Sequence, residues 1–303
     1  MFKEFTVEKD FNNTRFDKWF KKKVLNVPQS FIEKILRKNK VKVNKKKIKT
    51  SYRVQFNDVI KIYDFNKFEK KIEIKKIKYK PSIKEKKNYD NFVLEDNEDF
   101  IIINKPYGVP VQGGTKSFKN VIDILKNTKY FQETQPFLVH RIDKETSGLL
   151  MIAKNRKYAQ LLTSLFRIRK IHKTYLAIVY GDVSKNIKLL KDDLVYYEKN
   201  KKIIQKAISY IKVLKTNSRY SFLELNPITG RKHQLRKQLL NIGHPIIGDN
   251  KYFIKKEENK VKLKSLMLHA FKIKFMINNV KYNFKADYTK EFKYFLEQKF
   301  KFY

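Results

Sequence analysis

The chain of 303 residues contains no cysteine, which excludes disulfide frameworks, thiolate nucleophiles and cysteine-ligated metal sites. The absence of cysteine fits a reducing compartment, and the first residues, MFKEFTVEKDF, lack the apolar stretch of a signal peptide. No run approaches the roughly 18 apolar residues that a membrane-spanning helix needs. These absences predict a soluble, cytoplasmic protein, and a hydrophobic content of 42% is enough for a sizeable core.

Acidic residues are also scarce, since 30 Asp and Glu stand against 70 Lys and Arg and leave a net charge of +40. Such an excess destabilises a compact state unless a polyanion offsets it, so the charge predicts a nucleic-acid partner. Sixty of the 70 cations are lysine and only ten are arginine. This bias is typical of an AT-rich coding sequence, so part of the lysine excess reflects composition rather than binding.

Glycine is the third scarce residue, with eight in the chain and none in the first 107 residues. If codon bias removes glycine wherever another residue serves, the remaining ones mark positions that need a positive φ or a close backbone approach. The eight are Gly108, Gly113, Gly114, Gly148, Gly181, Gly230, Gly243 and Gly248. Most of them lie within the motifs considered next.

The stretch from His140 to Leu150, HRIDKETSGLL, is the most informative in the chain. It places Asp143 two residues after Arg141, before a Thr-Ser-Gly turn and an apolar run that predicts a buried strand. A carboxylate beside an arginine in such a loop can stay ionised while partly buried. On local chemistry alone, an aspartate that caps the turn through its side chain is the better explanation.

Further strings accompany this one along the chain. They are INKPYGVPVQGG from Ile103, HKTYLAIVYG from His172, PITGRKHQLR from Pro227, GDNKY from Gly248 and LMLHA from Leu266. Together with HRIDKETSG, these strings resemble, in order, the motifs of the pseudouridine synthase family that modifies ribosomal and transfer RNA. The resemblance is closest to members that act on bacterial large-subunit ribosomal RNA, although Phe253 stands where the family usually has Gly.

The resemblance implies roles for three residues. Asp143 would be the nucleophile, attacking either the sugar C1′ or the base. Tyr175 would stack on the uracil and relay the proton that leaves C5, and Arg236 would pair with Asp143 and keep it ionised. From the residues alone, Tyr175 is better explained as an ordinary strand aromatic packed in the core, and Arg236 can equally be a phosphate contact on a helix surface.

A uridine in folded RNA must leave its stack to reach an enclosed pocket. Arg141 is placed to occupy the vacated space or to contact its phosphates. We expect Lys105, Arg231 and Lys232 to contact backbone phosphates, which position the RNA without reading its sequence.

The implied reaction is redox-neutral and rejoins the base to its own sugar, so one carboxylate suffices where glycoside hydrolases need two. No cofactor is therefore expected. The histidines are His140, His172, His233, His244 and His269. They form no HExxH motif, so no metal is expected, and His140, His233 and His269 are expected to brace motif loops.

The segment Arg15–Tyr63 predicts two short helices and a small sheet, and it is similar to an S4 domain, a small RNA-binding module. The second helix is expected to begin with a capping box of Ser30 and Glu33. Lysines crowd this segment, and Arg37 and Lys38 are the expected RNA contacts, although most lysine runs are simply solvated. Asn39, Lys45 and Asn57 stand where the S4 family often has Gly; asparagine tolerates a left-handed turn better than lysine.

We expect an α+β fold with an S4-like domain over residues 1–80, a linker over 81–91 and a catalytic domain over 92–303. In the catalytic domain, strands are expected at 100–103, 149–153, 174–180, 207–213, 221–225, 266–275 and 280–284. Helices are expected at 121–125, 158–166, 234–240 and 288–300, and a further strand at 72–77. Many strands with few helices favour a mixed, largely antiparallel sheet.

The sequence therefore predicts a monomeric pseudouridine synthase that acts on large-subunit ribosomal RNA or its assembly precursor. Two alternatives stay open: the same reaction on transfer RNA or on another ribosomal site, and an inactive RNA-binding or ribosome-assembly protein of the same fold. The presence of Asp143, Tyr175 and Arg236 argues against the second.

Overall fold

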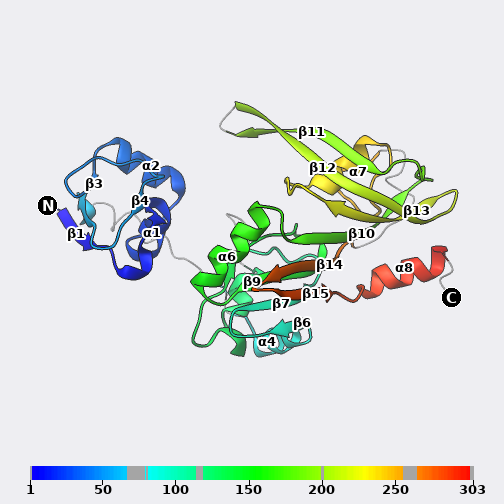
Figure 1. The fold of residues 1–303 in the computed structure, drawn as a ribbon, viewed down its shortest axis with the longest axis horizontal. Coiled ribbons are helices and arrows are strands. Elements are labelled where there is room, and N and C mark those ends of the chain that lie inside the picture. The colour runs from blue at the N-terminus through cyan, green and yellow to red at the C-terminus, as the bar shows by residue number, and fades with distance from the viewer. Residues whose placement is uncertain are drawn as a thin grey trace. The chain divides into compact units, whose positions relative to one another are not determined.

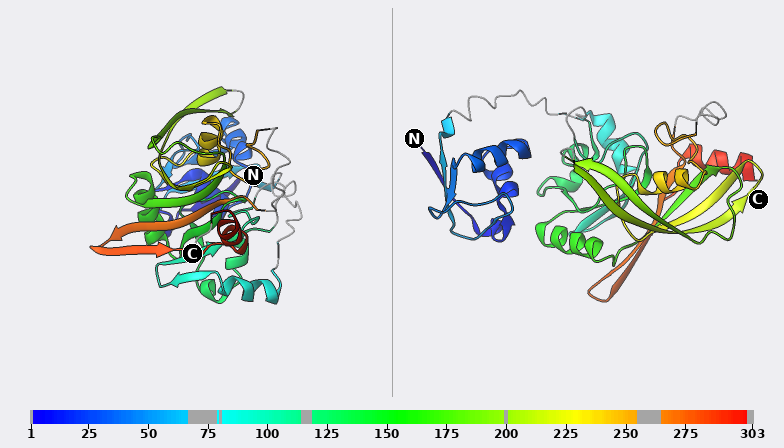
Figure 2. Two further views of the ribbon diagram at one scale, coloured as in Figure 1. Left: turned by 90° about the vertical axis from the view of Figure 1, so that its right-hand side faces the viewer. Right: turned by 90° about the horizontal axis from the view of Figure 1, so that it is seen from above.

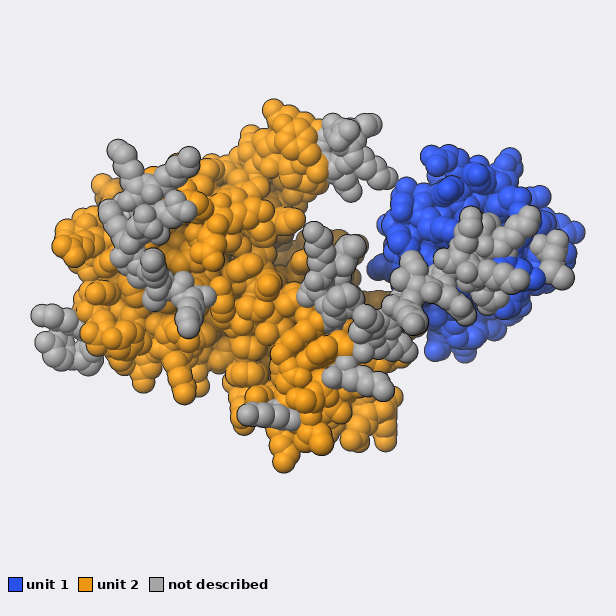
Figure 3. All heavy atoms as spheres, turned by 180° about the vertical axis from the view of Figure 1, so that it is seen from behind, with its two compact units in different colours: residues 1–77 blue, residues 78–303 orange. Residues whose placement is uncertain are grey.

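The computed structural model describes residues 2–66, 79, 81–113, 119–198, 201–254 and 265–300. The chain forms two compact units, Met1–Ile77 and Lys78–Tyr303, which Figure 3 shows in different colours. The described residues of each unit form hydrophobic cores of their own, with no member in common. Each unit therefore has the packing of an independent domain.

In its described residues, unit 1 contains the short helices α1 (Phe16–Lys23) and α2 (Gln29–Arg37) and two small antiparallel sheets (Figure 1). The 3-10 turn η1 (Lys9–Phe11) precedes these helices. The strands of unit 1 are β1 (Phe2–Thr6), β2 (Thr14–Arg15), β3 (Val41–Val43), β4 (Arg53–Val54) and β5 (Val59–Tyr63). β5 lies between β1 and β3 in one sheet, and β2 pairs with β4 in the other.

Both helices of unit 1 bury an apolar face with helical spacing. The buried residues are Phe16, Trp19 and Phe20 in α1 and Ile32, Ile35 and Leu36 in α2. The start of α2 differs from the expectation, because the helix begins at Gln29 and the Ser30–Glu33 capping box does not form. Pro28 takes the N-cap position, where its ring fixes φ and no side-chain cap is made.

Several turns of unit 1 have a left-handed backbone without glycine, and three of the residues concerned stand where the sequence departs from the S4 family. Asn39, Lys45 and Asn57 have φ values of 54°, 65° and 66°. These are the three positions where the S4 family often has Gly, so the turns keep their conformation. Asparagine adopts it at low cost, whereas lysine bears the full steric penalty of its Cβ.

Unit 2 is built on one large mixed sheet (Figures 1 and 2). Its strands are β6 (Val93–Asp96), β7 (Phe100–Lys105), β8 (Phe137–Leu138), β9 (Ser147–Ala153), β10 (His172–Tyr180), β11 (Leu189–Glu198), β12 (Lys201–Thr216), β13 (Tyr220–Pro227), β14 (Leu268–Ile277) and β15 (Val280–Lys285). Within the described residues the order is β11-β12-β13-β10-β14-β9-β7-β6, with β15 paired to β14 and β8 to β9. The β9–β14 pair is parallel, whereas the other pairings are antiparallel.

Strands β7 and β9 are covered on both faces, which explains why they are almost wholly apolar. Ile101 and Leu150 belong to one core cluster, together with residues of α5 (Val121–Leu125). Phe100 and Met151 belong to the cluster on the other face, together with Leu162 of α6 (Arg156–Arg167).

The remaining helices of unit 2 cover the other half of the sheet. They are α7 (Gln234–Asn241) and α8 (Lys290–Phe300). The 3-10 turn η2 (Lys129–Phe131) lies in the first half, where Phe131 joins the core around α5. Gln238 of α7 accepts a bond from Ser209 of β12 at 2.7 Å, which fixes the helix on the strand. None of the described helices is long and apolar enough to cross a membrane.

The boundary region differs from the expectation. Residues 81–91, expected to be a linker, contain helix α4 (Ile83–Asp90), which Ser82 and Glu85 start with a capping box. Tyr89 of this helix is 4% exposed and joins the core around Ile101. The sequence did not predict this helix because IKEKKNYD is mostly polar, without a regular apolar face, and one aromatic residue anchors it. The strand expected at Ile72–Ile77 lies outside the described residues.

Candidate active site

Asp143 lies in the loop that joins β8 to β9. The loop is closed by its backbone, since the amide of Thr146 donates to the carbonyl of Asp143 at 3.2 Å. The carboxylate, 23% exposed, faces His233 and Arg236 rather than the turn. The turn-capping explanation of Asp143 therefore does not hold among the described contacts, because the backbone closes the turn and the side chain has other partners.

The carboxylate opens into a cavity of about 760 Å³. Asp143 comes from the β8–β9 loop, Tyr175 from β10, and Thr229 and His233 from the segment between β13 and α7. Asp143 is the one acidic side chain among the described residues that line this cavity. The remaining polar lining is mainly basic.

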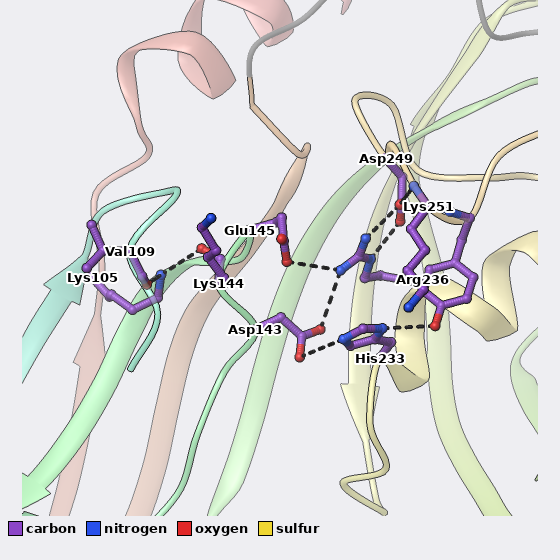
Figure 4. Close-up of polar contacts among 10 residues, drawn as sticks. Lys105, Val109, Asp143, Lys144, Glu145, His233, Arg236, Asp249 and Lys251 are labelled. Carbon is purple, nitrogen blue, oxygen red and sulfur yellow. Dashed lines mark hydrogen bonds and ion pairs between the residues drawn. The ribbon is translucent and has the colours of Figure 1, made fainter. Parts of the chain in front are cut away.

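Arg236 is 3% exposed and lies in the first turn of α7. Figure 4 shows its contacts with the neighbouring carboxylates. Its principal partner is Asp249, which it binds through Nε and Nη2 at 2.7 Å each. Its Nη1 lies 3.3 Å from Glu145 and 3.9 Å from Asp143. The expected pairing with Asp143 is thus present as a longer ion pair, while Asp249 fixes the orientation of the guanidinium.

His233 approaches Asp143 from the other side, with Nε2 3.7 Å from Oδ1 (Figure 4). Its Nδ1 lies 2.9 Å from the hydroxyl of Tyr252. If that hydroxyl donates, the neutral imidazole carries its proton on Nε2 and directs it at the carboxylate. His233 is also the N-cap of α7 in a left-handed conformation, with φ of 53°, and such strain is typical of functional positions.

The loop after Gly248 contacts both Arg236 and His233, through Asp249 and Tyr252. Asp249 accepts bonds from the amides of Lys251 and Tyr252, both at 2.9 Å, and so shapes the loop that carries Tyr252. The ring of Tyr252 lies over the guanidinium of Arg236, 5.1 Å from its centroid. Asp249 therefore positions both side chains that flank Asp143: Arg236 directly and His233 through Tyr252.

Burial dominates the electrostatics of this group. It raises the pKa of Asp143, against the opposing effects of His233 and Arg236, while Glu145 raises it further. The pKa of His233 is lowered, again mainly by burial and despite the neighbouring Asp143. His233 and Arg236 thus favour the ionised form of Asp143, while burial opposes it and keeps the carboxylate poorly solvated.

Tyr175 lines the same cavity from β10, two residues after Lys173. A β-bulge between Thr174 and Tyr175 interrupts the pairing of β10 with β14 at this point. Burial, and then the charge of Asp143, raise the pKa of Tyr175, so its phenol stays protonated. The hydroxyl has no hydrogen-bond partner among the described residues, and the ring packs against two core clusters while it lines the cavity.

Lys105 is the clear correction among the expected RNA contacts. It is 0% exposed, and its ammonium donates to the carbonyls of Pro106, Val109 and Lys144 at 2.8, 2.9 and 3.2 Å. Burial lowers its pKa to about 7, although Glu145 and Asp143 oppose this. The three donors of the ammonium bind carbonyls of two loops, so Lys105 joins the loop after β7 to the loop of Asp143. We call this contact the buried clamp.

The other expected RNA contacts are accessible. Arg141, Arg231 and Lys232 line the cavity, and Arg231 also donates from Nε to the carbonyl of Lys206 at 3.1 Å. Arg37 and Lys38 are exposed at the end of α2 in unit 1. His140 and His269 brace loops as expected: His140 accepts from the amide of Met151, and His269 pairs with Ser147, both at 2.9 Å.

Sequence reasoning gave no role to Asp249, Glu145 or Tyr252, although GDNKY was recognised as a motif. The available signal was the chemistry of Arg236. A guanidinium that is buried in a helix turn needs a carboxylate partner, and GDNKY contains Asp249. Sequence reasoning also gave no role to the arginines at the end of α6, which line the cavity.

The chain is similar to known proteins over most of its length. Residues 99–241 match the model of the RNA pseudouridylate synthase family, and residues 14–60 match that of the S4 domain. The ribosomal large subunit pseudouridine synthase C of Buchnera aphidicola (subsp. Schizaphis graminum) is 34% identical over 288 residues, covering 89% of this chain and 88% of that protein. The protein of the same name from Rickettsia conorii is 37% identical, covering 79% and 82%.

A solved structure agrees with these matches. Human RNA Pseudouridylate Synthase Domain Containing 4 superposes with a TM-score of 0.59 and 25% identity, covering 70% of this chain and 94% of the human one. An α+β domain with a large, mostly antiparallel sheet is thus common to both. The chain belongs to the RNA pseudouridylate synthase family and is a pseudouridine synthase, an isomerase, with an S4 domain ahead of its catalytic domain.

Proposed function

We propose that this enzyme converts specific uridines of large-subunit ribosomal RNA to pseudouridine, with Asp143 as its nucleophile. The observation that carries the proposal is that Asp143 is the one acidic side chain among the described residues lining a largely basic cavity of about 760 Å³. A single carboxylate fits an isomerisation in which no water has to be activated. A cavity of this size accommodates one nucleotide that has left its stack.

The chemistry balances with the groups present. Asp143 attacks either C1′ of the ribose or the uracil ring, the C1′–N1 bond breaks, and the uracil turns within the pocket. A bond then forms between C5 and C1′, the proton on C5 is lost, and N1 gains a proton. Asp143 is released unchanged, and neither an oxidant nor a reductant is consumed.

Tyr175 and Arg236 serve that sequence of steps. The ring of Tyr175 stacks on the uracil as it turns, and its protonated phenol relays the proton from C5. Arg236, held by Asp249, keeps Asp143 ionised and in place. Our proposal adds His233 as a second donor to the same carboxylate, at 3.7 Å.

The choice of substrate rests on the relatives and on the charge. The related proteins from Buchnera aphidicola and Rickettsia conorii are named for the ribosomal large subunit. The S4 domain and the net charge of +40 suit a large polyanion. Arg141, Arg231 and Lys232 would contact its backbone near the pocket, and Arg37 and Lys38 would contact it from unit 1. We expect an enzyme with such a substrate to work in the cytoplasm.

Mapping pseudouridines in total RNA from cells with and without the gene tests the proposal. We expect a small set of sites in large-subunit ribosomal RNA to disappear with the gene and to return with the wild-type gene but not with Asp143→Asn. Loss of sites confined to transfer RNA or to the small subunit would overturn the substrate assignment. An unchanged map would overturn the catalytic function.

A further inference from the structure

Arginine is distributed very unevenly in this chain. Ten of the 70 cationic residues are arginine, so lysine is the default cation. Yet five of the ten line the cavity, beside two lysines among the described residues: the arginines are Arg141, Arg167, Arg169, Arg231 and Arg236. Where composition replaces arginine by lysine, the arginines that remain mark sites that need a planar fork of donors, as bidentate binding of carboxylate or phosphate does.

Three of these arginines form no hydrogen bond or ion pair within the described part of the chain: Arg141 in the loop of Asp143, to which a phosphate contact is already assigned, and the pair Arg167 and Arg169 at the end of α6. Arg236 is held by Asp249, and Arg231 donates to the carbonyl of Lys206. Arg167 and Arg169, in contrast, are exposed and form no side-chain hydrogen bond or ion pair within the described part of the chain. Their guanidinium groups are therefore available to a ligand.

The end of α6 holds these two residues in a defined geometry. The amide of Lys170 donates to the carbonyl of Leu165 at 2.9 Å, and that of Arg169 to Phe166 at 3.2 Å, which is a Schellman termination of the helix. Arg169 takes the left-handed position with φ of 62°, where glycine or asparagine is usual. An arginine in this conformation carries backbone strain, and such strain is typical of positions whose side chain has a function.

The last turn of α6 is fixed beside the loop that carries Asp143. The ring of Phe166 stacks on His140, with centroids 4.4 Å apart, and His140 accepts a bond from the amide of Met151 in β9. Burial, and then the charge of Lys173, lower the pKa of His140 to about 3, so the imidazole is neutral and adds no charge of its own. Arg167 and Arg169 are thus on a rigid support beside the loop of Asp143. We call these two arginines, together with Lys173, the basic wall of the cavity.

Lys173 completes the basic wall from β10. It lines the cavity on the same strand as Tyr175 and two residues before it, so both side chains lie on one face of the strand, about 7 Å apart along it. Lys173 has no hydrogen bond or ion pair among the described residues, and burial alone lowers its pKa. A buried cation without a counter-ion is costly, and an incoming anion removes that cost.

We propose that Arg167, Arg169 and Lys173 form a binding site for the RNA phosphates that flank the target uridine. This proposal rests on the proposed function and deepens it. Lys173 contacts the phosphate of the nucleotide whose base lies on Tyr175, and the two arginines hold the neighbouring phosphates at the rim.

The test uses the full-length chain and a stem-loop of large-subunit ribosomal RNA that contains a mapped target uridine. Affinities are measured over a range of salt concentrations for wild type, Arg167→Gln, Arg169→Gln and the double variant. Arg219→Gln is the matched control: Arg219 is an exposed arginine at the opposite end of β13 from the cavity. Arg167→Lys and Arg169→Lys separate the need for charge from the need for a fork.

Each glutamine variant should bind about tenfold more weakly, because a charge-assisted contact is lost. Each should also lower the slope of log K against log salt by about 0.7, as for one phosphate on a single strand. The lysine variants should recover the slope but not the full affinity, and Arg219→Gln should match wild type. Equal behaviour of Arg167→Gln, Arg169→Gln and Arg219→Gln would overturn the proposal.

A complementary change in the RNA locates the contact. Neutral methylphosphonate linkages at the two phosphates flanking the uridine should weaken wild type, yet have little further effect on the double variant. Additive losses would mean that the arginines bind elsewhere, and would overturn the proposal. Conversion of the unmodified stem-loop is scored separately: a wild-type enzyme that binds it through the basic wall but makes no pseudouridine would contradict the proposed function alone.

Discussion

At the scale of single residues, the ionised form of Asp143 is less favourable in the folded protein than in the unfolded chain. Burial raises its folded pKa above the unfolded value. The stability that this carboxyl contributes is thus fully present below the unfolded pKa of about 3.9 and is lost as pH rises through the folded pKa. An active protein at neutral pH therefore keeps an ionised carboxylate at some cost in stability.

Asp143→Asn should consequently abolish turnover without lowering stability at pH 7. Asparagine keeps the shape and stays neutral, and Arg236 retains Asp249 as its main partner. We expect a melting temperature equal to or above that of wild type at pH 7, with the difference vanishing near pH 4. Thermal unfolding at both pH values and a turnover assay check this; a marked loss of stability, or activity near wild type, would contradict it.

Tyr175→Phe isolates the hydroxyl from the ring. The ring that stacks on the base is retained, so RNA affinity should hardly change. The hydroxyl has no partner among the described residues, so its removal should leave the free energy of unfolding within about 0.5 kcal/mol of wild type. If the phenol relays the proton from C5, turnover should still fall sharply, with rearranged base accumulating on the RNA. Full turnover would make Tyr175 a packing and stacking residue.

Lys105→Met tests the buried clamp. Removal of the ammonium leaves three carbonyls without their donor, which we expect to cost about 1–3 kcal/mol at neutral pH and to loosen the loop of Asp143. A conventional surface lysine would show neither effect. Because affinity for RNA should be nearly unchanged, a variant that folds stably but binds RNA weakly would restore the phosphate-contact interpretation.

The same variant has a defined pH dependence. The folded pKa of Lys105 is depressed to about 7, so its contribution to stability is present above the unfolded pKa of about 10.4 and is lost as pH falls through 7. The stability difference between wild type and Lys105→Met should therefore be smaller at pH 6 than at pH 9. Urea unfolding at the two pH values measures it, and a difference that grows toward low pH would be the opposite result.

At the scale of elements, the parallel pairing of β9 with β14 fixes the start of β9, to which the loop of Asp143 is joined. It depends on Gly148, which has φ of 103° and faces the backbone of Ala270. A Cβ there would lie 2.3 Å from the carbonyl oxygen of Ala270. No side chain fits unless the two strands separate.

Gly148→Ala should therefore lower the free energy of unfolding by about 3 kcal/mol or more, from backbone strain and overpacking together, and should reduce turnover. Gly243→Ala is its control. Gly243 has a similar φ of 83°, but nothing lies within 4 Å of its added Cβ, so about 1 kcal/mol of strain is expected. Equal destabilisation by the two substitutions would mean that the contact with β14 is unimportant.

Elements with strong apolar periodicity were predictable. β7, β9 and α6 were all expected near their actual bounds, because each buries a dense apolar face. β11 was not, since LLKDDLVYYE mixes charges and aromatics and is stabilised by pairing with β12 rather than by its own pattern. The glycine argument held locally: five of the seven glycines that the structure describes have positive φ, as the composition predicted.

At the scale of the whole molecule, we expect the two units to have separate tasks, RNA docking in unit 1 and catalysis in unit 2. Unit 1 and unit 2 have separate cores, so removal of residues 1–77 should leave a folded protein with an intact cavity. Its affinity for ribosomal RNA should fall, with a shallower salt dependence, because the phosphate contacts of unit 1 are gone. In the full chain, Arg37→Ala with Lys38→Ala should lower the log–log slope by about one for each lost contact.

Binding and conversion of ribosomal RNA by the truncated and full-length enzymes, compared at several salt concentrations, provide the measurement. Conversion of a short stem-loop should be less affected than conversion of the long RNA, because the catalytic groups stay in unit 2. If truncation changed neither affinity nor its salt dependence, unit 1 would not be the docking element.

The sequence alone indicated the α+β class, and its motifs resembled those of the S4 domain and of the pseudouridine synthase family; that resemblance, not local chemistry, singled out Asp143, Tyr175 and Arg236 as site residues. These are local matters: contiguous motifs, apolar periodicity and turn chemistry are all written along the chain. The tertiary structure decided what the charged side chains bind. Asp249 and Arg236 lie 13 residues apart, and Lys105 and Lys144 39 apart. Whether a lysine faces solvent or three carbonyls depends on which loops meet after folding, and burial, which sets the pKa of Asp143, exists only in the folded chain.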